Sequence, residues 1–141
     1  KAIVAIPNDP ANETRALLLL QHAGLIKLKP TSSDVATVHD IDKNPKELQF
    51  KEMDAAQLPR TLPDVDLAVI NTNYALLGGL NPTKDALIKE TASSPYANIV
   101  VVRTLEKDAP KFKQLLEALH SEAVVKKAEE LFKNQAIAAW K

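Results

Sequence analysis

A chain of 141 residues with 45% hydrophobic residues is long enough for one ordinary domain with a buried core. Lysine plus arginine and aspartate plus glutamate number 18 each, and no block of like charge offers a surface to nucleic acid or anionic lipid. The sequence has no cysteine, which excludes disulfides and thiolate chemistry, and no apolar run as long as the roughly 20 residues of a membrane span. We therefore expect a soluble protein without a nucleic-acid partner.

The chain opens with a strand, a tight loop and a helix. Residues 2–7, AIVAIP, form a short apolar run that is ended by proline and is typical of a buried strand. Asp9 followed by Pro10 is an N-cap with proline at the first helical position, and Gly24 suits the position just after a helix end. The helix between them carries Arg15 close to four consecutive leucines.

The middle of the chain continues the alternation of strands and helices. Residues 25–46 are mixed, and helix and strand interpretations compete there. Residues 48–53 predict a half-buried strand, and residues 55–60 a short helix broken by its proline. Residues 66–71 predict a fully buried strand, and residues 71–79 a second strand-to-helix turn closed by two glycines.

The last third begins with β-type runs and ends with helices. Residues 86–90 suit an edge strand, and residues 97–103, ANIVVVR, are the strongest predicted strand in the chain. From Pro110 to Lys133 apolar residues recur at helical spacing, and Ser121 starts a second helix.

Strands that alternate with helices predict an α/β fold: a three-layer sandwich whose mixed, mostly parallel sheet has helices on both faces. In such sheets ligands bind beyond the strand ends, often against helix N-termini. Three segments follow or adjoin predicted strands and are candidates for one shared edge: residues 8–15, 71–74 and 96–98.

Two residues of these segments stand out by their chemistry. The guanidinium of Arg15 is a planar fork that can hold a carboxylate with two hydrogen bonds, or it can lie on the surface and pair with Asp9 or Glu13. Asn71 ends a predicted buried strand, where its amide must find partners. It can bind a ligand or its own loop backbone.

The remaining candidates keep both interpretations open. Asn98 lies just inside a predicted strand, where a neutral amide is unusual, and it can contact a ligand or cap the preceding turn. Tyr74 and Tyr96 can stack on a ligand or belong to the core. Asn8 and Asn12 complete the possible rim of the pocket.

Several kinds of site are not expected. The three histidines, His22, His39 and His120, lie in different segments without metal-ligand spacing, so we predict no metal site. No nucleophile elbow, phosphate loop, dinucleotide fingerprint or isolated carboxylate pair is present, so we predict no cofactor and no enzymatic activity.

Four stretches together resemble the NlpA/MetQ-type lipoproteins, the methionine-binding components of bacterial ABC importers. They are VAIPNDPANETRALLLLQHAGLIKLK, AAQLPRTLPDVDLAVINTNYA, SSPYANIVVVR and the helical run that ends in AIAAW. The resemblance covers essentially the whole chain, in order.

The resemblance implies one lobe of a type II periplasmic-binding-protein fold, which closes around a free amino acid, with L-methionine as the expected ligand. Matched by motif, Arg15, Asn71 and Asn98 would hold the charged α-groups. The importer's membrane subunits would be the partners, and the complete protein would be lipid-anchored, in the periplasm or on the outer face of the cytoplasmic membrane. The alternative is a ligand-sensing effector domain of a regulator.

The resemblance also implies a division of the chain. Residues 1–103 would be the second, ligand-binding lobe, and the helices of residues 104–141 would pack with the first lobe or with a partner chain. Family members carry a signal peptide, a lipidated cysteine and most of a first lobe before the segment that begins this chain. We therefore expect a fragment, and a homodimer of this fragment could cover the apolar faces of its C-terminal helices. Glu13-Thr14 and Asn73 depart from the expected family pattern and leave the choice between methionine and a related amino acid open.

Overall fold

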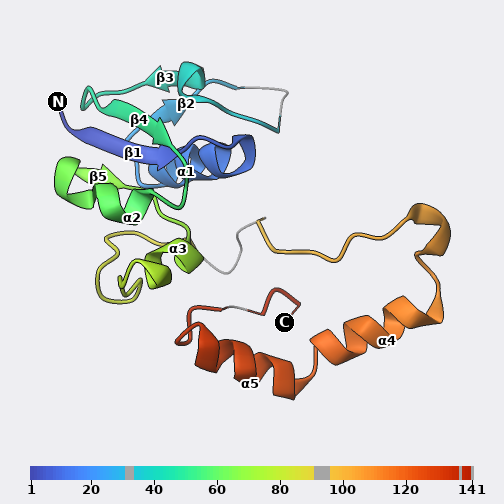
Figure 1. The fold of residues 1–141 in the computed structure, drawn as a ribbon. Coiled ribbons are helices and arrows are strands. Elements are labelled where there is room, and N and C mark those ends of the chain that lie inside the picture. The colour runs from blue at the N-terminus through green and yellow to red at the C-terminus, as the bar shows by residue number, and fades with distance from the viewer. Residues whose placement is uncertain (31–33, 91–95, 137, 141) are drawn as a thin grey trace. The chain divides into compact units, whose positions relative to one another are not determined.

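The structure, a computed structural model, describes residues 1–30, 34–90, 96–136 and 138–140. The chain divides into two units, residues 1–90 and residues 91–141, and each is described by itself (Figure 1). No helix of the described ranges is long and apolar enough to cross a membrane.

A three-stranded parallel sheet forms the centre of the first unit. Its strands are β1 (Ile3–Pro7), β4 (Gln49–Met53) and β5 (Leu67–Ala68), in the order β4-β1-β5. Residues 4 to 7 of β1 are buried, because this central strand is covered on both faces. The predicted strands at residues 2–7 and 48–53 are confirmed.

Helices cover both faces of the sheet. Val4 and Ile6 of β1 face helix α1 (Pro10–His22), where they share a core with Leu17 and Leu20. Ala5 faces the other way and packs with Leu58 of helix α2 (Leu58–Thr61), in a cluster to which helix α3 (Thr72–Leu77) adds Tyr74. Alternate residues of one strand therefore serve two layers, which confirms the predicted three-layer α/β arrangement.

Helix α1 begins and ends where the sequence predicts. The Asp9 side chain accepts a hydrogen bond from the backbone N–H of Asn12, and Pro10 lies in the first turn. Gly24 follows the helix with φ +70°, and the backbone N–H of Leu25 donates to the carbonyl of Leu20. This is the Schellman ending that glycine favours.

Two predicted elements differ from the structure. Pro59 lies at the start of α2 rather than breaking a helix, because the first turn needs no donor from that residue. Strand β5 is confined to Leu67–Ala68 and is half-buried instead of fully buried. Its register with β1 spans only these two residues, and the backbone N–H groups of Asp66 and Val69 donate to Ile3 and Ala5 at its two ends, so the strand stops short of the predicted end at residue 71.

The ambiguous segment of residues 25–46 holds a small antiparallel pair. Strand β2 (Lys27–Leu28) pairs with β3 (Ile41–Lys43), and a 3-10 turn (Val38–Asp40) precedes β3. Buried Thr14 ties this segment to α1, since its Oγ1 accepts a hydrogen bond of 2.9 Å from the N–H of Ala36.

The second unit contains helices α4 (Pro110–Leu119) and α5 (Glu122–Leu131). Ser121 caps α5, which confirms the predicted restart. Several large apolar side chains of these helices and of the residue after α5 are exposed: Leu115, Leu116, Val124, Leu131 and Phe132. The expected homodimer and the expected boundary between lobes at residue 103 stay predictions.

The predicted strands at residues 86–90 and 97–103 are wrong. Both runs are described, and neither forms a strand. Ile99 and Val101 are each 79% exposed. A β-branched run has the propensity for a strand but becomes one only when a neighbouring strand pairs with it, and the described residues provide none here.

Candidate functional site

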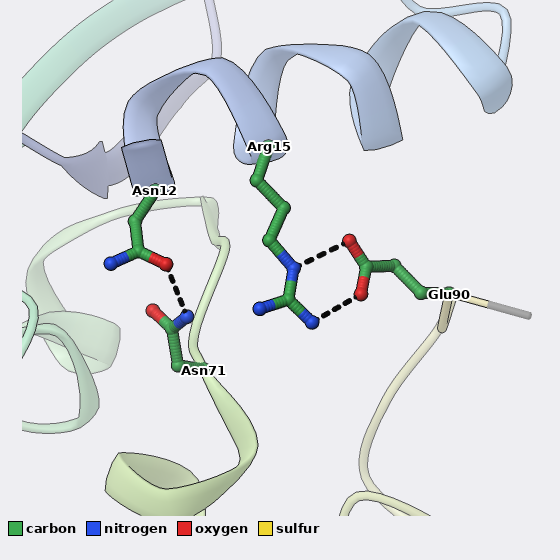
Figure 2. Close-up of polar contacts among 4 residues, drawn as sticks. All are labelled: Asn12, Arg15, Asn71 and Glu90. Atoms are coloured by element: carbon green, nitrogen blue, oxygen red, sulfur yellow. Dashed lines mark hydrogen bonds and ion pairs between the residues drawn. The ribbon is translucent and has the colours of Figure 1, made fainter. Parts of the chain in front are cut away.

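A network of polar side chains lies where β1 and β5 end. Asp9, Asn12 and Arg15 follow β1 on the first turns of α1, and Asn71 stands at the start of α3, after β5. These strands are parallel neighbours, so their carboxyl ends share one edge of the sheet. Figure 2 shows Asn12 and Arg15 on one side of α1, with Asn71 beside them.

Hydrogen bonds connect Asp9, Asn12 and Asn71 in series. Asn12 Nδ2 donates to both carboxylate oxygens of Asp9, at 3.1 and 3.0 Å. Asn71 Nδ2 donates to Asn12 Oδ1 at 2.7 Å. The hydrogen bond from the Asn12 side chain is also the main cause that lowers the pKa of Asp9. The lowered pKa favours the ionised carboxylate, which accepts hydrogen bonds.

The direction of this series fixes the orientation of both amides. An ionised carboxylate accepts only, so Asn12 must turn its NH2 group to Asp9 and its oxygen to Asn71. Asn71 must then turn its own NH2 group to Asn12, which leaves its oxygen at the end of the series. That oxygen, Asn71 Oδ1, is buried and has no hydrogen-bond partner among the described residues. Asn71 is not the loop cap that was the alternative, since its side chain makes no capping bond.

Arg15 pairs with Glu90, a residue 75 positions away in sequence. Arg15 Nε donates to Glu90 Oε1 at 2.7 Å, and Arg15 Nη2 donates to Glu90 Oε2. The side chains are 35% and 25% exposed. Arg15 therefore lies at the candidate edge and holds a carboxylate with two hydrogen bonds, as a planar fork can.

The carboxylates of Asp9 and Glu13 were the alternative partners of Arg15, and both accept hydrogen bonds from other groups. Asp9 binds Asn12, and Glu13 is buried, with its Oε1 accepting a hydrogen bond of 3.0 Å from the N–H of Val38. Burial raises the pKa of Glu13 above its ordinary value of 4.5, and the nearby Glu52 raises it further.

Glu13 is expected to make the stability of the first unit pH-dependent. A raised folded-state pKa stabilises the fold below the unfolded value, about 4.5, and this stabilisation is lost as the pH rises through the folded value. Glu13→Gln does not titrate, and its amide oxygen can still accept from Val38. Urea unfolding at each pH gives the free energy of unfolding of the variant minus that of the unmodified protein. This difference should favour the variant more at about pH 7 than at about pH 4. A stability difference that is the same at both pH values would contradict the assignment.

The remaining predicted residues lie in varied surroundings. Asn8 is exposed, and its backbone N–H donates to Met53 at the end of β4, whereas Tyr74 is half-buried in the core cluster around Leu58. Asn98 and Tyr96 belong to the second unit, where Asn98 is exposed and Tyr96 half-buried. The structure thus brings Arg15, Asn12 and Asn71 together, and the place of Asn98 in the site stays a prediction.

The sequence interpretation missed Glu90. Its segment was assigned to an edge strand, and a glutamate 75 residues from Arg15 carries no local signal of the pairing. Groups of histidine and acidic side chains that could hold a metal ion do not occur among the described residues.

Comparison with known proteins matches this chain to the family described as NlpA lipoprotein, over residues 1–140. The chain is 46% identical over 139 residues to the probable D-methionine-binding lipoprotein MetQ of Vibrio cholerae. The match covers 99% of this chain and 52% of that protein, so the chain spans about half the length of the curated relatives it matches.

Solved structures agree with the sequence match. A periplasmic substrate-binding protein of an ABC transporter from Coxiella burnetii is 55% identical, with a TM-score of 0.87, over 98% of this chain and 58% of that one. A nutrient-binding protein from Burkholderia cenocepacia, bound to methionine, is 56% identical, with a TM-score of 0.84, over 94% of this chain and 56% of that one. The chain therefore belongs to the NlpA lipoprotein family.

Proposed function

We propose that this chain is the part of an ABC importer's substrate-binding protein that holds the charged α-groups of a free amino acid, most simply methionine. The observation that carries the proposal is the orientation of Asn71. The series from Asp9 leaves the buried acceptor oxygen of Asn71 without a hydrogen-bond partner among the described residues, and the same edge of the sheet carries the half-buried Arg15. A zwitterionic amino acid needs both an arginine and an acceptor oxygen, because its carboxylate binds a cation and its ammonium donates to neutral or anionic acceptors.

The free energy of a buried, unsatisfied acceptor supports a role in binding. Such a group costs roughly 1–3 kcal/mol, and native proteins contain few of them. An ammonium that donates to Asn71 Oδ1 recovers this cost when the ligand binds. Arg15 then binds the carboxylate of the same ligand, and Asn98 of the second unit is the third proposed contact.

The names of the relatives support methionine as the ligand. The Vibrio cholerae relative is named for D-methionine, and the Burkholderia cenocepacia structure contains methionine. The resemblance of the sequence suggests L-methionine, so both enantiomers belong in every binding test. No reaction is part of this function.

The same comparisons support a partner and a location. The relative from Vibrio cholerae is named a lipoprotein, and the Coxiella burnetii structure is a periplasmic component of an ABC transporter. We place the intact protein in the periplasm or on the outer face of the cytoplasmic membrane, with a lipid anchor outside this chain and the importer's membrane subunits as partners. Residues 1–103 would serve as the ligand-binding lobe, and residues 104–141 would pack with the remainder of the protein.

Alanine variants of the two asparagines test the function. Asn71→Ala and Asn98→Ala should each weaken methionine binding by at least about tenfold, since a hydrogen bond to a charged group contributes roughly 1.5–3 kcal/mol. Both should leave the melting temperature of the ligand-free protein nearly unchanged. Calorimetric titration and thermal unfolding of the intact protein measure the two effects.

Asn44→Ala is the matched control. The Asn44 side chain bonds both the N–H and the carbonyl of Leu48, so it holds a turn. This variant should lower the melting temperature and leave the affinity unchanged. If Asn71→Ala or Asn98→Ala behaves like Asn44→Ala, that residue is a structural amide and its proposed contact with the ligand is wrong.

A further inference from the structure

We propose that Asn12 is a positioning residue for ligand recognition: it holds the Asn71 amide so that the amide oxygen, and not the NH2 group, is offered to the ligand's ammonium. This inference rests on the proposed function. It gives Asn12 a different role from the pocket rim that the sequence suggests, because Asn12 acts through Asn71 and does not itself touch the ligand.

The side chain of Asn71 depends on Asn12 for its orientation. Asn71 stands at the N-cap of α3, where its side chain makes no capping bond. The bond of 2.7 Å from its Nδ2 to Asn12 Oδ1 is the one hydrogen bond that this side chain makes within the described ranges. The two ends of an amide have nearly the same size and shape, so this bond determines which end faces away from Asn12.

Asn12 is itself held by Asp9. Its Nδ2 lies 3.1 and 3.0 Å from the two carboxylate oxygens, and its backbone N–H donates to the same carboxylate at 3.0 Å as the cap of α1. The oxygen of the Asn12 side chain accepts from Asn71. Both polar atoms of this side chain therefore have partners within the protein, which favours a positioning role over direct contact with the ligand.

A reversed Asn71 amide is disfavoured by this arrangement. Its oxygen would face the oxygen of Asn12, and two acceptors cannot form a hydrogen bond. If Asn12 also reversed, its oxygen would face the carboxylate of Asp9, which is an acceptor too. An ammonium has only donors, so it could not bind the NH2 group of a reversed Asn71. The charge of Asp9 therefore determines, through Asn12, which end of Asn71 the ligand meets.

The effect of Asn12 is expected to be confined to the ligand's ammonium. Figure 2 shows the oxygen of Asn71 on the side away from Arg15, so this acceptor and the guanidinium are separate points of contact. The ligand's carboxylate is assigned to Arg15. Loss of the Asn12 side chain should therefore affect only ligands that carry an ammonium.

The experiment is a calorimetric titration of the intact protein and its Asn12→Ala, Asn71→Ala and doubly substituted variants. The ligands are methionine, methioninol, which lacks the carboxylate, and deaminomethionine, which lacks the ammonium. Asn12→Ala should weaken methionine and methioninol by the same factor, at least about threefold, because the Asn71 side chain must then be ordered when the ligand binds. It should leave the binding of deaminomethionine unchanged. In the Asn71→Ala background, Asn12→Ala should have no further effect.

Gln21→Ala is the matched control on the same helix. The Gln21 side chain accepts a hydrogen bond of 2.7 Å from the N–H of Leu28 and so ties α1 to β2. This variant should lower the melting temperature and bind all three ligands as the unmodified protein does. Asn12→Ala is expected to keep α1 intact, since alanine favours a helix and the capping bond to Asp9 comes from the backbone N–H.

Four outcomes would overturn the inference. An equal loss for all three ligands would make Asn12 a structural residue only. An unchanged or increased affinity of Asn12→Ala for methionine, with Asn71→Ala still weakened, would show that the proposed function holds without Asn12. A loss that persists in the Asn71→Ala background would place Asn12 in direct contact with the ligand. If Asn71→Ala itself binds methionine and methioninol normally, the assignment of the ammonium to Asn71 fails first.

Discussion

Arg15→Ala is expected to weaken methionine binding by the intact protein at least about tenfold, because a charge-assisted hydrogen bond contributes roughly 1.5–3 kcal/mol. The side chain lies at the edge of the sheet and pairs with Glu90. Its removal takes away a cation that holds a carboxylate at this edge of the sheet. Calorimetric titration of the purified protein measures the change.

Two further substitutions sharpen this expectation. Arg15→Lys should recover little affinity, since the point charge of lysine lacks the planar fork that holds a carboxylate with two hydrogen bonds. Arg60→Ala removes an exposed arginine from α2 and should leave binding unchanged. Equal dissociation constants for Arg15→Ala and the unmodified protein would contradict the proposed role of Arg15.

Leu17→Ala is expected to cost roughly 2–5 kcal/mol in the free energy of unfolding of the first unit. Leu17 is fully buried and packs in the cluster that joins α1 to Val4 and Ile6 of β1. Truncation leaves a cavity between the helix and the central strand, where neighbours on both sides are fixed. Urea unfolding monitored by circular dichroism measures the loss.

Leu18→Ala is the matched control for this change. Leu18 is the next residue of the same helix and is 37% exposed. Its truncation should cost much less than that of Leu17. Equal costs at the two positions would show that α1 does not pack on the sheet through the face that carries Leu17.

The contrast between these leucines also explains why an arginine stands so close to them. Helix α1 buries Ala16, Leu17 and Leu20 against the sheet, while Asn12 and Arg15, three residues apart, lie together on another side. One helix therefore packs the core and carries the polar groups of the site.

The beginning of the chain could be predicted because its signals are local. A β-branched run, Asp9 with Pro10, and Gly24 each determine the conformation of their own neighbourhood, and β1 and α1 follow. The run at residues 97–103 failed because a strand depends on a partner, which propensity does not reveal.

The candidate site was partly predictable for the same reason. Arg15 and Asn71 stand at strand-to-helix turns, which the sequence marks. The pairing of Arg15 with Glu90 and the orientation of the Asn71 amide depend on groups brought together by the fold. Only the structure shows that the series starting at Asp9 ends in an acceptor.

The most direct test of the account is a calorimetric comparison of methionine, methioninol and N-acetylmethionine on the intact protein. The proposed site would contact both charged α-groups, through Arg15 and through Asn71 Oδ1. Methionine should bind, and each analogue, which lacks one of the two charges, should bind at least about tenfold more weakly. N-acetylmethionine that binds as tightly as methionine would contradict the central claim that the site recognises a zwitterion.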